Sequence, residues 1–453
     1  MAAPIAMRSG ERLFPLNSRA FIQRVGNTLL RLGSLGAKLV FTLYIGRYLG
    51  LAEMGTYGLV AAYVAILISV LGVRFDYVVG RDIVSVSPYE VACKIRDQIV
   101  FYALNYAILA AALALLAAGP LKEIRTETLL FILSLSILES LASITTGNIV
   151  SLKQPVLATV LFFIRSSLWT LPAMVLGILY PATRTADFIF LWWLAGVSVS
   201  LVATCFAWRG MPWGAALKTP VDWSWILSGA RNCILIWLGT IGAAAATYVD
   251  RFAVEHYLTL DFVGIASFYG SFVIAMQSLL HSSVFSFTYP RLITHYRQRD
   301  DAAFRRELRH MTMQATLFGG FMAVMIGVIV PILGGIFHRP EFADQAFILW
   351  MMLFGAWIRC TTEGVYFVLY ARHQDRLIWA GGLLVLIPAF VCNMVFVPVY
   401  GFAGIGYSAV VTNVFLCLWR LFCLTRKPPP REMEETPQPI GVLPGTEEQD
   451  EIF

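Results

Sequence analysis

This sequence has too few charged residues to form an aqueous surface. Only 14% of its 453 residues are charged and 58% are hydrophobic. A soluble globular protein has about 25% charged residues. The mean hydropathy of +0.70 agrees with this imbalance. A soluble fold is therefore excluded, and the chain is expected to lie in a membrane.

Two further absences narrow the class of protein. The chain lacks the alternating segments of roughly ten residues that are typical of a membrane β-barrel. Its seven cysteines are odd in number, and they form neither a CxxC motif nor a group with histidine. We therefore expect no disulfide, no metal and no cofactor.

Long apolar runs recur along the sequence, and each could cross roughly 30 Å of hydrocarbon as a helix. They predict an all-α polytopic membrane protein with about twelve transmembrane helices. The expected spans are 25–46, 55–79, 98–119, 128–150, 156–179, 187–208, 224–249, 262–289, 312–336, 342–370, 377–397 and 402–424.

The basic residues predict the orientation of these spans. Lys and Arg gather in the connections on the side of the N-terminus, including the Arg-rich segment 291–310. By the positive-inside rule, both termini are expected in the cytoplasm. This rule also accounts for the net charge of +6, so no nucleic-acid partner is inferred. No cleavable signal is expected, because Arg8, Arg12, Arg19 and Arg24 precede a first span too long for one.

Short loops on the opposite side argue against an enzyme. Each is about ten residues or fewer, whereas membrane enzymes that build polysaccharides need room there for catalytic groups. We therefore expect no enzymatic activity.

An internal repeat divides the chain into two halves. Tyr48–Gly55 reads YLGLAEMG, and Tyr257–Gly264, 209 residues later, reads YLTLDFVG. Each lies in a short break between two apolar spans, and six spans per half predict a parallel repeat about an axis along the membrane normal. The predicted units are a cytoplasmic N-terminal segment (1–24), an N-lobe (25–208), a cytoplasmic linker (209–223), a C-lobe (224–425) and a disordered cytoplasmic tail (426–453).

Polar residues inside the spans are the candidate functional residues, because a charge at bilayer depth costs about 2.5–3.5 kcal/mol on insertion scales. The first span carries five of them, spaced so that they share one helix face. They are Asn27, Arg31, Ser34, Lys38 and Thr42. This stripe predicts either a wall of a hydrated cavity, which we favour, or a polar seam between packed helices.

Further deep cations are Arg165, Arg231 and Arg359, and the deep acids are Glu139 and Glu363. Several have a second interpretation. Arg231 could extend to the cytoplasmic interface, as we expect for Arg74 and Arg420. Arg359 and Glu363 are four residues apart and could neutralise each other. His281, a candidate for the polar cavity wall, could simply join two helices.

Cations outnumber acids at depth, which suits a phosphate or pyrophosphate group better than an organic cation. Glu139 has no basic residue three or four positions away. A carboxyl buried without a partner tends to bind a proton. Glu139, and less strongly Glu363, are therefore candidates for coupling transport to a cation or to pH.

Several stretches resemble the polysaccharide-exporter and O-antigen flippase family of the multidrug/oligosaccharidyl-lipid/polysaccharide (MOP) superfamily. They are Tyr44–Gly50 with Met54–Tyr57, Tyr248–Arg251 followed by Gly264, Thr288–Arg291, and Pro398–Gly406. The resemblance covers roughly residues 22–425. It implies a MATE-like fold of two lobes, cationic residues in the first helix, and flipping of an undecaprenyl-pyrophosphate-linked oligosaccharide by alternating access. The repeat places Thr240 and Thr247 at the counterparts of Arg31 and Lys38, so the second lobe departs from that charge pattern.

The sequence is thus interpreted as a lipid-linked oligosaccharide flippase of a bacterial inner membrane. Its partners would be the polyprenyl-pyrophosphate-linked oligosaccharide, membrane lipids and the polymerase and chain-length machinery of surface polysaccharide synthesis. Two alternatives stay open. One is a drug or organic-cation exporter of the same superfamily, which an acidic cavity would favour. The other is a membrane enzyme or scaffold of polysaccharide synthesis, which a catalytic outside loop would favour.

Overall fold

The structure is a computed structural model that describes residues 18–84, 86–119 and 125–426, with side chains from Leu29 onward. Every regular element in these ranges is a helix. The predicted N-terminal segment up to residue 17 and the predicted tail from residue 427 lie outside the described residues. The all-α prediction is confirmed for the described part of the chain.

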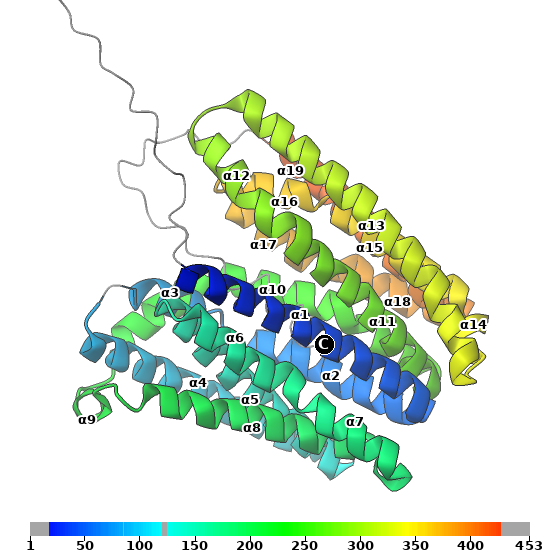
Figure 1. Ribbon diagram of the computed structural model, residues 1–453, viewed down its shortest axis with the longest axis horizontal. Coiled ribbons are helices and arrows are strands. Elements are labelled where there is room, and N and C mark those ends of the chain that lie inside the picture. Colours follow the sequence, from blue (N-terminus) through cyan, green and yellow to red (C-terminus); the bar gives the residue numbers. More distant parts are fainter. Residues whose placement is uncertain (1–17, 85, 120–124, 427–453) are drawn as a thin grey trace, which may run out of the picture.

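The helices form two groups, the N-lobe and the C-lobe (Figure 1). The N-lobe contains α1 (Ser18–Tyr48), α2 (Leu51–Leu71), α3 (Asp76–Asp82), α4 (Pro88–Ala117), α5 (Thr126–Ser151), α6 (Pro155–Phe163), η1 (Ile164–Leu168), α7 (Thr170–Leu179), η2 (Pro181–Thr183) and α8 (Ala186–Trp208). The linker contains α9 (Trp213–Ala216). The C-lobe contains α10 (Trp223–Tyr257), α11 (Leu260–Leu280), η3 (His281–Phe285), α12 (Ser286–Arg297), α13 (Asp301–Phe337), α14 (Glu341–Asp344), α15 (Ala346–Thr361), α16 (Glu363–Ala371), α17 (Asp375–Leu384), α18 (Leu386–Tyr400) and α19 (Ala403–Leu424).

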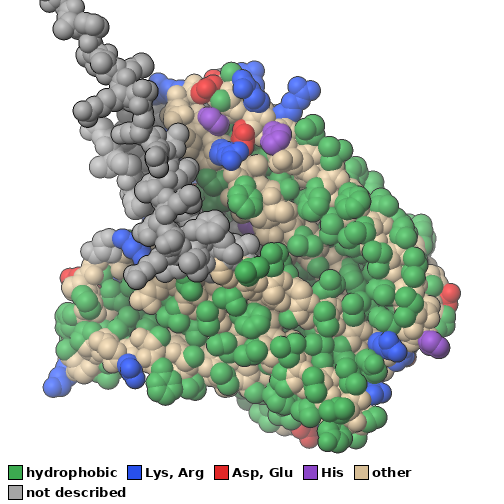
Figure 2. Space-filling view, viewed as in Figure 1, with side chains coloured by type: hydrophobic (Ala, Val, Ile, Leu, Met, Phe, Trp, Pro, Cys, Tyr) green, Lys and Arg blue, Asp and Glu red, His purple; other side chains and the backbone are tan. Residues whose placement is uncertain are grey.

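Eleven helical stretches within the described residues are long and apolar enough to cross a membrane. Eleven of the twelve predicted spans correspond to them. The remaining one, predicted at 342–370, is divided at Thr362 into α15 and α16, each too short to count alone. Figure 2 shows hydrophobic side chains over the broad face of the molecule and Lys and Arg mainly near its ends. The chain is a multi-pass membrane protein.

The predicted repeat appears in the helix boundaries. α1 ends at Tyr48 and α10 at the equivalent Tyr257, while α2 and α11 begin and end at equivalent residues. α2 and α11 also pack on each other reciprocally. A β-carbon on Gly55 would lie 2.1 Å from the Leu260 carbonyl oxygen, and one on Gly264 would lie 2.3 Å from that of Leu51. Such exchange of equivalent contacts is what a pseudo-two-fold axis between α2 and α11 produces.

This glycine contact joins the lobes at the end where α1 meets α2. Two more bonds cross between the lobes there. Arg339 donates to the Leu49 carbonyl at 2.8 Å, and the buried Arg251 donates to the Gly58 carbonyl at 3.3 Å. Toward the opposite end, where α12 meets α13, the two groups of helices diverge in Figure 1. The lobes are therefore closed on each other at one end of the bundle.

Adding one methyl group at this contact is expected to destabilise the protein. Gly55→Ala and Gly264→Ala each place a carbon against backbone, which cannot rotate away. Overpacking of this kind costs about 1–3 kcal/mol. The melting temperature of the purified protein measures the loss. Gly147→Ala is the matched control, because no atom lies within 4 Å of a β-carbon there. Unchanged melting temperatures in the first two variants would contradict the close approach of α2 and α11.

The linker is fastened to the N-lobe by a buried arginine. Arg96 on α4 pairs with Asp97 and donates to backbone carbonyls of Ala216, Thr219 and Pro220. Asp222 then caps α10, and the hydrogen bond from the Ser224 hydroxyl lowers the pKa of its carboxyl. The start of the C-lobe is thus held in place by α4.

Candidate functional site: three polar cavities

The first cavity lies mainly in the N-lobe, with α11 forming part of its wall. Lys38 on α1 lines it together with Glu139 on α5 and Arg165 on η1. The Arg165 Nε lies 3.3 Å from a Glu139 carboxylate oxygen, and both side chains are more than nine-tenths buried. Lys38 and Arg165 also lie 5.7 and 5.5 Å from the centre of the same Phe162 ring. The two cations therefore belong to one site.

Local helix geometry and aromatic packing position the Arg165–Glu139 pair. Arg165 lies in η1, a single π-helical turn that interrupts its membrane span, and such turns occur frequently at functional sites. The Trp193 indole N–H donates to Glu139 at 2.5 Å. Trp193 stacks on Trp169 with ring centres 6.1 Å apart. The carboxylate thus has a buried cation and a buried N–H donor, which hold it in one orientation.

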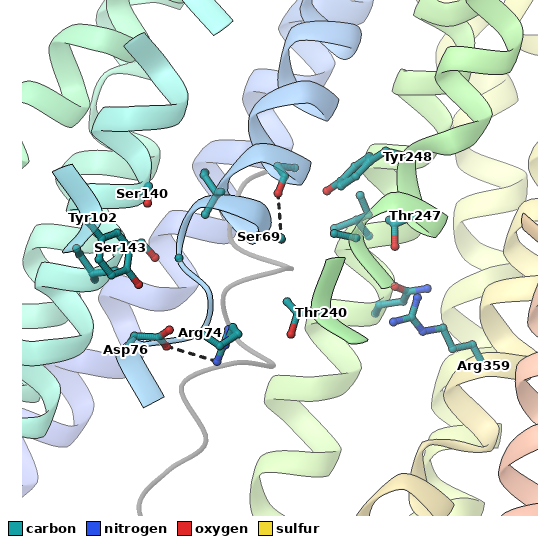
Figure 3. A pocket seen from close by; sticks show the side chains of 17 residues that line it. Ser69, Arg74, Asp76, Tyr102, Ser140, Ser143, Thr240, Thr247, Tyr248 and Arg359 are labelled. Atoms are coloured by element: carbon teal, nitrogen blue, oxygen red, sulfur yellow. Dashed lines mark hydrogen bonds and ion pairs between the residues drawn. The ribbon is translucent and has the colours of Figure 1, made fainter. Parts of the chain in front are cut away.

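The second cavity lies between the lobes, and Figure 3 shows its polar side chains. Arg74 and Asp76 lie on one side and form an ion pair of 3.5 Å. Arg359 extends from the C-lobe on the other side. Among the described residues, Arg359 has no acidic partner within ion-pair distance. Val73 and Arg74 have left-handed backbone, with φ of 46° and 51°, which is strained for a β-branched residue such as Val73. Strained backbone of this kind clusters at binding sites.

The third cavity lies inside the C-lobe and is the largest of the three, at about 280 Å³. Glu363 lines it and forms an ion pair of 2.8 Å with Arg420. Arg420 also donates to the Arg359 carbonyl and the Thr362 hydroxyl, both at 3.2 Å. It therefore caps the backbone where the tenth span breaks between α15 and α16. Arg359, Gln277, Thr240 and Thr247 line this cavity and the interlobe one, so the two cavities adjoin.

Basic side chains exceed acidic ones in every cavity. Six basic and four acidic residues line the three cavities, and each cavity taken alone has one basic residue more. The basic residues are Lys38, Arg74, Arg165, Arg251, Arg359 and Arg420. The acidic residues are Asp76, Glu139, Asp250 and Glu363. A positive cavity at membrane depth attracts anions and repels cations.

The structure brings only part of the predicted site together. Among the predicted cations, Lys38, Arg165 and Arg359 line cavities, whereas Arg31 on α1 and Arg231 on α10 are exposed and line none of the three. Of the predicted wall residues and acids, Thr42 and Glu139 line the N-lobe cavity, and His281 and Glu363 line the C-lobe cavity. Ser34 is buried against η1, where the Ser167 hydroxyl donates a hydrogen bond to the Ser34 carbonyl. The Asn27 side chain lies outside the described residues.

Three interpretations of individual charges were wrong. Glu139 does have a basic partner, Arg165, which comes from another helix and not from a position three or four residues away. Glu363 pairs with Arg420 and not with Arg359, because the helix breaks between Arg359 and Glu363. Arg74 and Arg420 do not extend to the interface; both are buried in ion pairs.

Arg251 and Trp193 are among the cavity residues that the sequence did not indicate as site residues. Arg251 is 2% exposed and lies over the Tyr248 ring at 4.9 Å. In the sequence it appears only within the Tyr248–Arg251 stretch that carries the family resemblance. Trp193, which holds Glu139, lies beside Trp192 in an apolar span, and nothing in the sequence pairs it with Glu139.

Comparisons with known proteins give a fold but no family. No family model and no curated protein matches the chain. Nineteen chains of solved structures match it. The lipid II flippase MurJ in an inward closed conformation is 15% identical, with a TM-score of 0.64, covering 90% of this chain and 88% of its own.

Two MATE transporter structures give similar values. The MATE multidrug transporter DinF-BH, in a ligand complex, has a TM-score of 0.57 at 13% identity, covering 90% of this chain and 95% of its own. A mutant of the Vibrio cholerae MATE transporter VcmN has a TM-score of 0.55 at 13% sequence identity, covering 90% of this chain and 96% of its own. These neighbours are transporters and not enzymes. At such identities the likeness concerns the fold, so the chain has the two-lobed helical fold of the MurJ and MATE structures.

Proposed function

We propose that this protein is a transporter that flips a polyprenyl-pyrophosphate-linked oligosaccharide across the bacterial inner membrane by alternating access. The observation that carries the proposal is the excess of basic over acidic side chains in all three cavities. A pyrophosphate group suits such cavities, because charge-assisted hydrogen bonds to Arg and Lys are strong. The shared fold with a lipid II flippase supports a lipid-linked substrate.

In this proposal the pyrophosphate binds near Lys38 and Arg165. Both cations line one cavity, and Glu139 supplies a single negative charge between them. The excess of basic over acidic side chains along this wall suits an anionic group. The polyprenyl tail stays in the lipid and the glycan occupies the polar cavities. The other predicted cations, Arg31 and Arg231, are exposed outside these cavities and have no part in the proposed pyrophosphate site.

The proposed orientation places both termini in the cytoplasm. Arginines at the α12–α13 end of the bundle support it. They are Arg291, Arg297, Arg299, Arg305, Arg306 and Arg309, all exposed. On this orientation the closed α2–α11 end of the lobes faces away from the cytoplasm, and a lipid-linked oligosaccharide would be loaded from the cytoplasmic side. The protein would hand its cargo to polymerase and chain-length machinery on the other side.

Transport by the purified protein in liposomes tests the proposal. Vesicles containing a fluorescent polyprenyl-pyrophosphate glycan are expected to lose inner-leaflet label, measured by a quencher or a glycan-cleaving enzyme added outside. A matched set of vesicles receives a lipophilic cationic dye. Flipping of the glycolipid without uptake of the dye is the expected result. Uptake of the dye without flipping of the glycolipid would contradict the proposal and indicate a drug exporter.

A further inference from the structure

Three buried polar oxygens in the C-lobe cavity have no hydrogen-bond partner in the described chain. They are the Asn393 Oδ1, the Ser408 Oγ and the Thr412 Oγ1. Their residues are 3%, 1% and 9% exposed. Leaving such groups unpaired is unfavourable, so buried polar atoms nearly always bond to protein or water. Each of these three oxygens therefore lacks a partner that a molecule in the cavity lined by their residues could supply.

Local geometry places the three oxygens on neighbouring walls. Ser408 and Thr412 are four residues apart on α19, so they share one helix face. Asn393 lies on α18, which packs against α19. Its amide nitrogen donates to the Ala389 carbonyl at 2.8 Å, which leaves the amide oxygen as the group not engaged by the chain. The result is a small polar surface of one amide and two hydroxyls.

Aromatic side chains form another part of the cavity wall. Trp379 on α17 and Trp419 on α19 line it. The Trp419 indole N–H donates to the Leu377 carbonyl at 3.2 Å, which fixes the ring. Indole rings offer flat apolar faces with a polar edge. A ligand that fits must therefore combine hydroxyl groups with an apolar face.

Charge in this cavity argues against a cationic ligand. Glu363 is engaged by Arg420, and Asp250 accepts from the backbone N–H of Arg251 at 2.9 Å. Basic residues outnumber acidic ones along the wall, which disfavours an inorganic cation. The three unpartnered oxygens are neutral groups. Hydroxyls, which both donate and accept, match them better than an ion does.

Size and access fit a sugar ring. The cavity of about 280 Å³ is near the lower limit of ligand pockets, which hold about 300–1,000 Å³. It adjoins the interlobe cavity through Gln277, Thr247 and Arg359, which line both. A glycan in the interlobe cavity could therefore place a terminal ring in the C-lobe.

We propose that the C-lobe cavity is a sugar-recognition chamber in which Asn393, Ser408 and Thr412 hydrogen-bond one neutral sugar ring that packs against Trp379 or Trp419. This inference rests on the proposed function for its biological cargo. The chamber itself recognises a sugar without pyrophosphate or lipid. It gives the transporter a means of selecting its glycan in the C-lobe, apart from the cations of the N-lobe cavity.

Binding of simple glycosides by the full-length protein in nanodiscs tests the chamber. The probes are methyl glycosides of common neutral hexoses and N-acetylhexosamines, measured by saturation-transfer NMR and by thermal shift in sodium-free buffer. At least one glycoside is expected to bind. Ser408→Ala and Thr412→Val should each weaken it about tenfold, the equivalent of about 1.4 kcal/mol. Neither change should lower the melting temperature of the ligand-free protein, because the hydroxyls removed have no partner in the chain.

Ser136→Ala is the matched control, since the Ser136 hydroxyl is also buried and unpartnered but lines none of the three cavities. It should bind the same glycoside normally. Absence of binding for every glycoside overturns the chamber. The chamber is also overturned if sodium alone shifts the melting temperature and Thr412→Val abolishes that shift, because the oxygens would then bind a cation. The assay contains no glycolipid, so its result is separate from that of the flipping experiment.

Discussion

Replacing Lys38 with alanine is expected to abolish most glycolipid flipping while leaving the protein folded. Lys38 lines the N-lobe cavity and is only partly buried, so its removal leaves no tightly packed space empty. A hydrogen bond to a charged group contributes about 1.5–3 kcal/mol. Losing it at the pyrophosphate corresponds to a fall of about 10- to 100-fold in flipping rate at low substrate concentration.

The flipping rate in liposomes, normalised to the amount of inserted protein, measures this effect. Lys38→Arg keeps the charge and should retain much of the activity. Arg231→Ala is the matched control, because it removes an exposed cation that lines none of the three cavities. Full activity of Lys38→Ala would rule out a pyrophosphate site in this cavity. An equal loss of flipping rate in Arg231→Ala would mean that flipping depends on the overall charge of the protein and not on the position of Lys38.

The helices and their repeat could be predicted from sequence because both depend on local patterns. Hydropathy located the spans, and the match of Tyr48 with Tyr257 gave a repeat that the boundaries of α2 and α11 follow. The break at Thr362 could not be found in this way. The stretch 342–370 is long enough for one span despite Arg359 and Glu363, and what stabilises the break is Arg420, more than fifty residues away in sequence.

The site was harder to predict because ion pairs in the cavities form between helices. Within the polar stripe of the first span, Ser34, Lys38 and Thr42 meet other helices, whereas Arg31 is exposed. The stripe could not indicate which helices its residues contact. Ser34 packs on η1 and Lys38 reaches the cavity, although both lie on that stripe. Spacing along one helix likewise could not pair Glu139 with Arg165, since their contact depends on how α5 and η1 are placed.

Replacing Arg165 with methionine is expected to destabilise the protein strongly. The change leaves the Glu139 carboxylate buried without its cation, and breaking a buried ion pair from one side costs about 3–5 kcal/mol. The double variant Arg165→Met with Glu139→Gln removes both charges and should recover most of that loss. Glutamine also keeps an oxygen that can accept from the Trp193 indole. The melting temperatures of the two purified variants measure the two losses of stability. An equally low melting temperature in both variants would contradict the ion pair.

The same pair offers a way to couple flipping to a cation, which we propose for Glu139. If the substrate phosphate draws Arg165 away, the carboxylate loses its cation, and a buried carboxylate without a cation tends to bind a proton. Substrate binding and proton uptake would then occur together. Glu139→Gln cannot bind that proton, so its flipping rate should no longer respond to an imposed pH gradient, whereas the unchanged protein should respond. If both proteins respond alike to pH and sodium gradients, Glu139 serves only to hold Arg165 in place. Glu363, already paired with Arg420, is the second candidate, and Glu363→Gln in the same assay distinguishes the two acids.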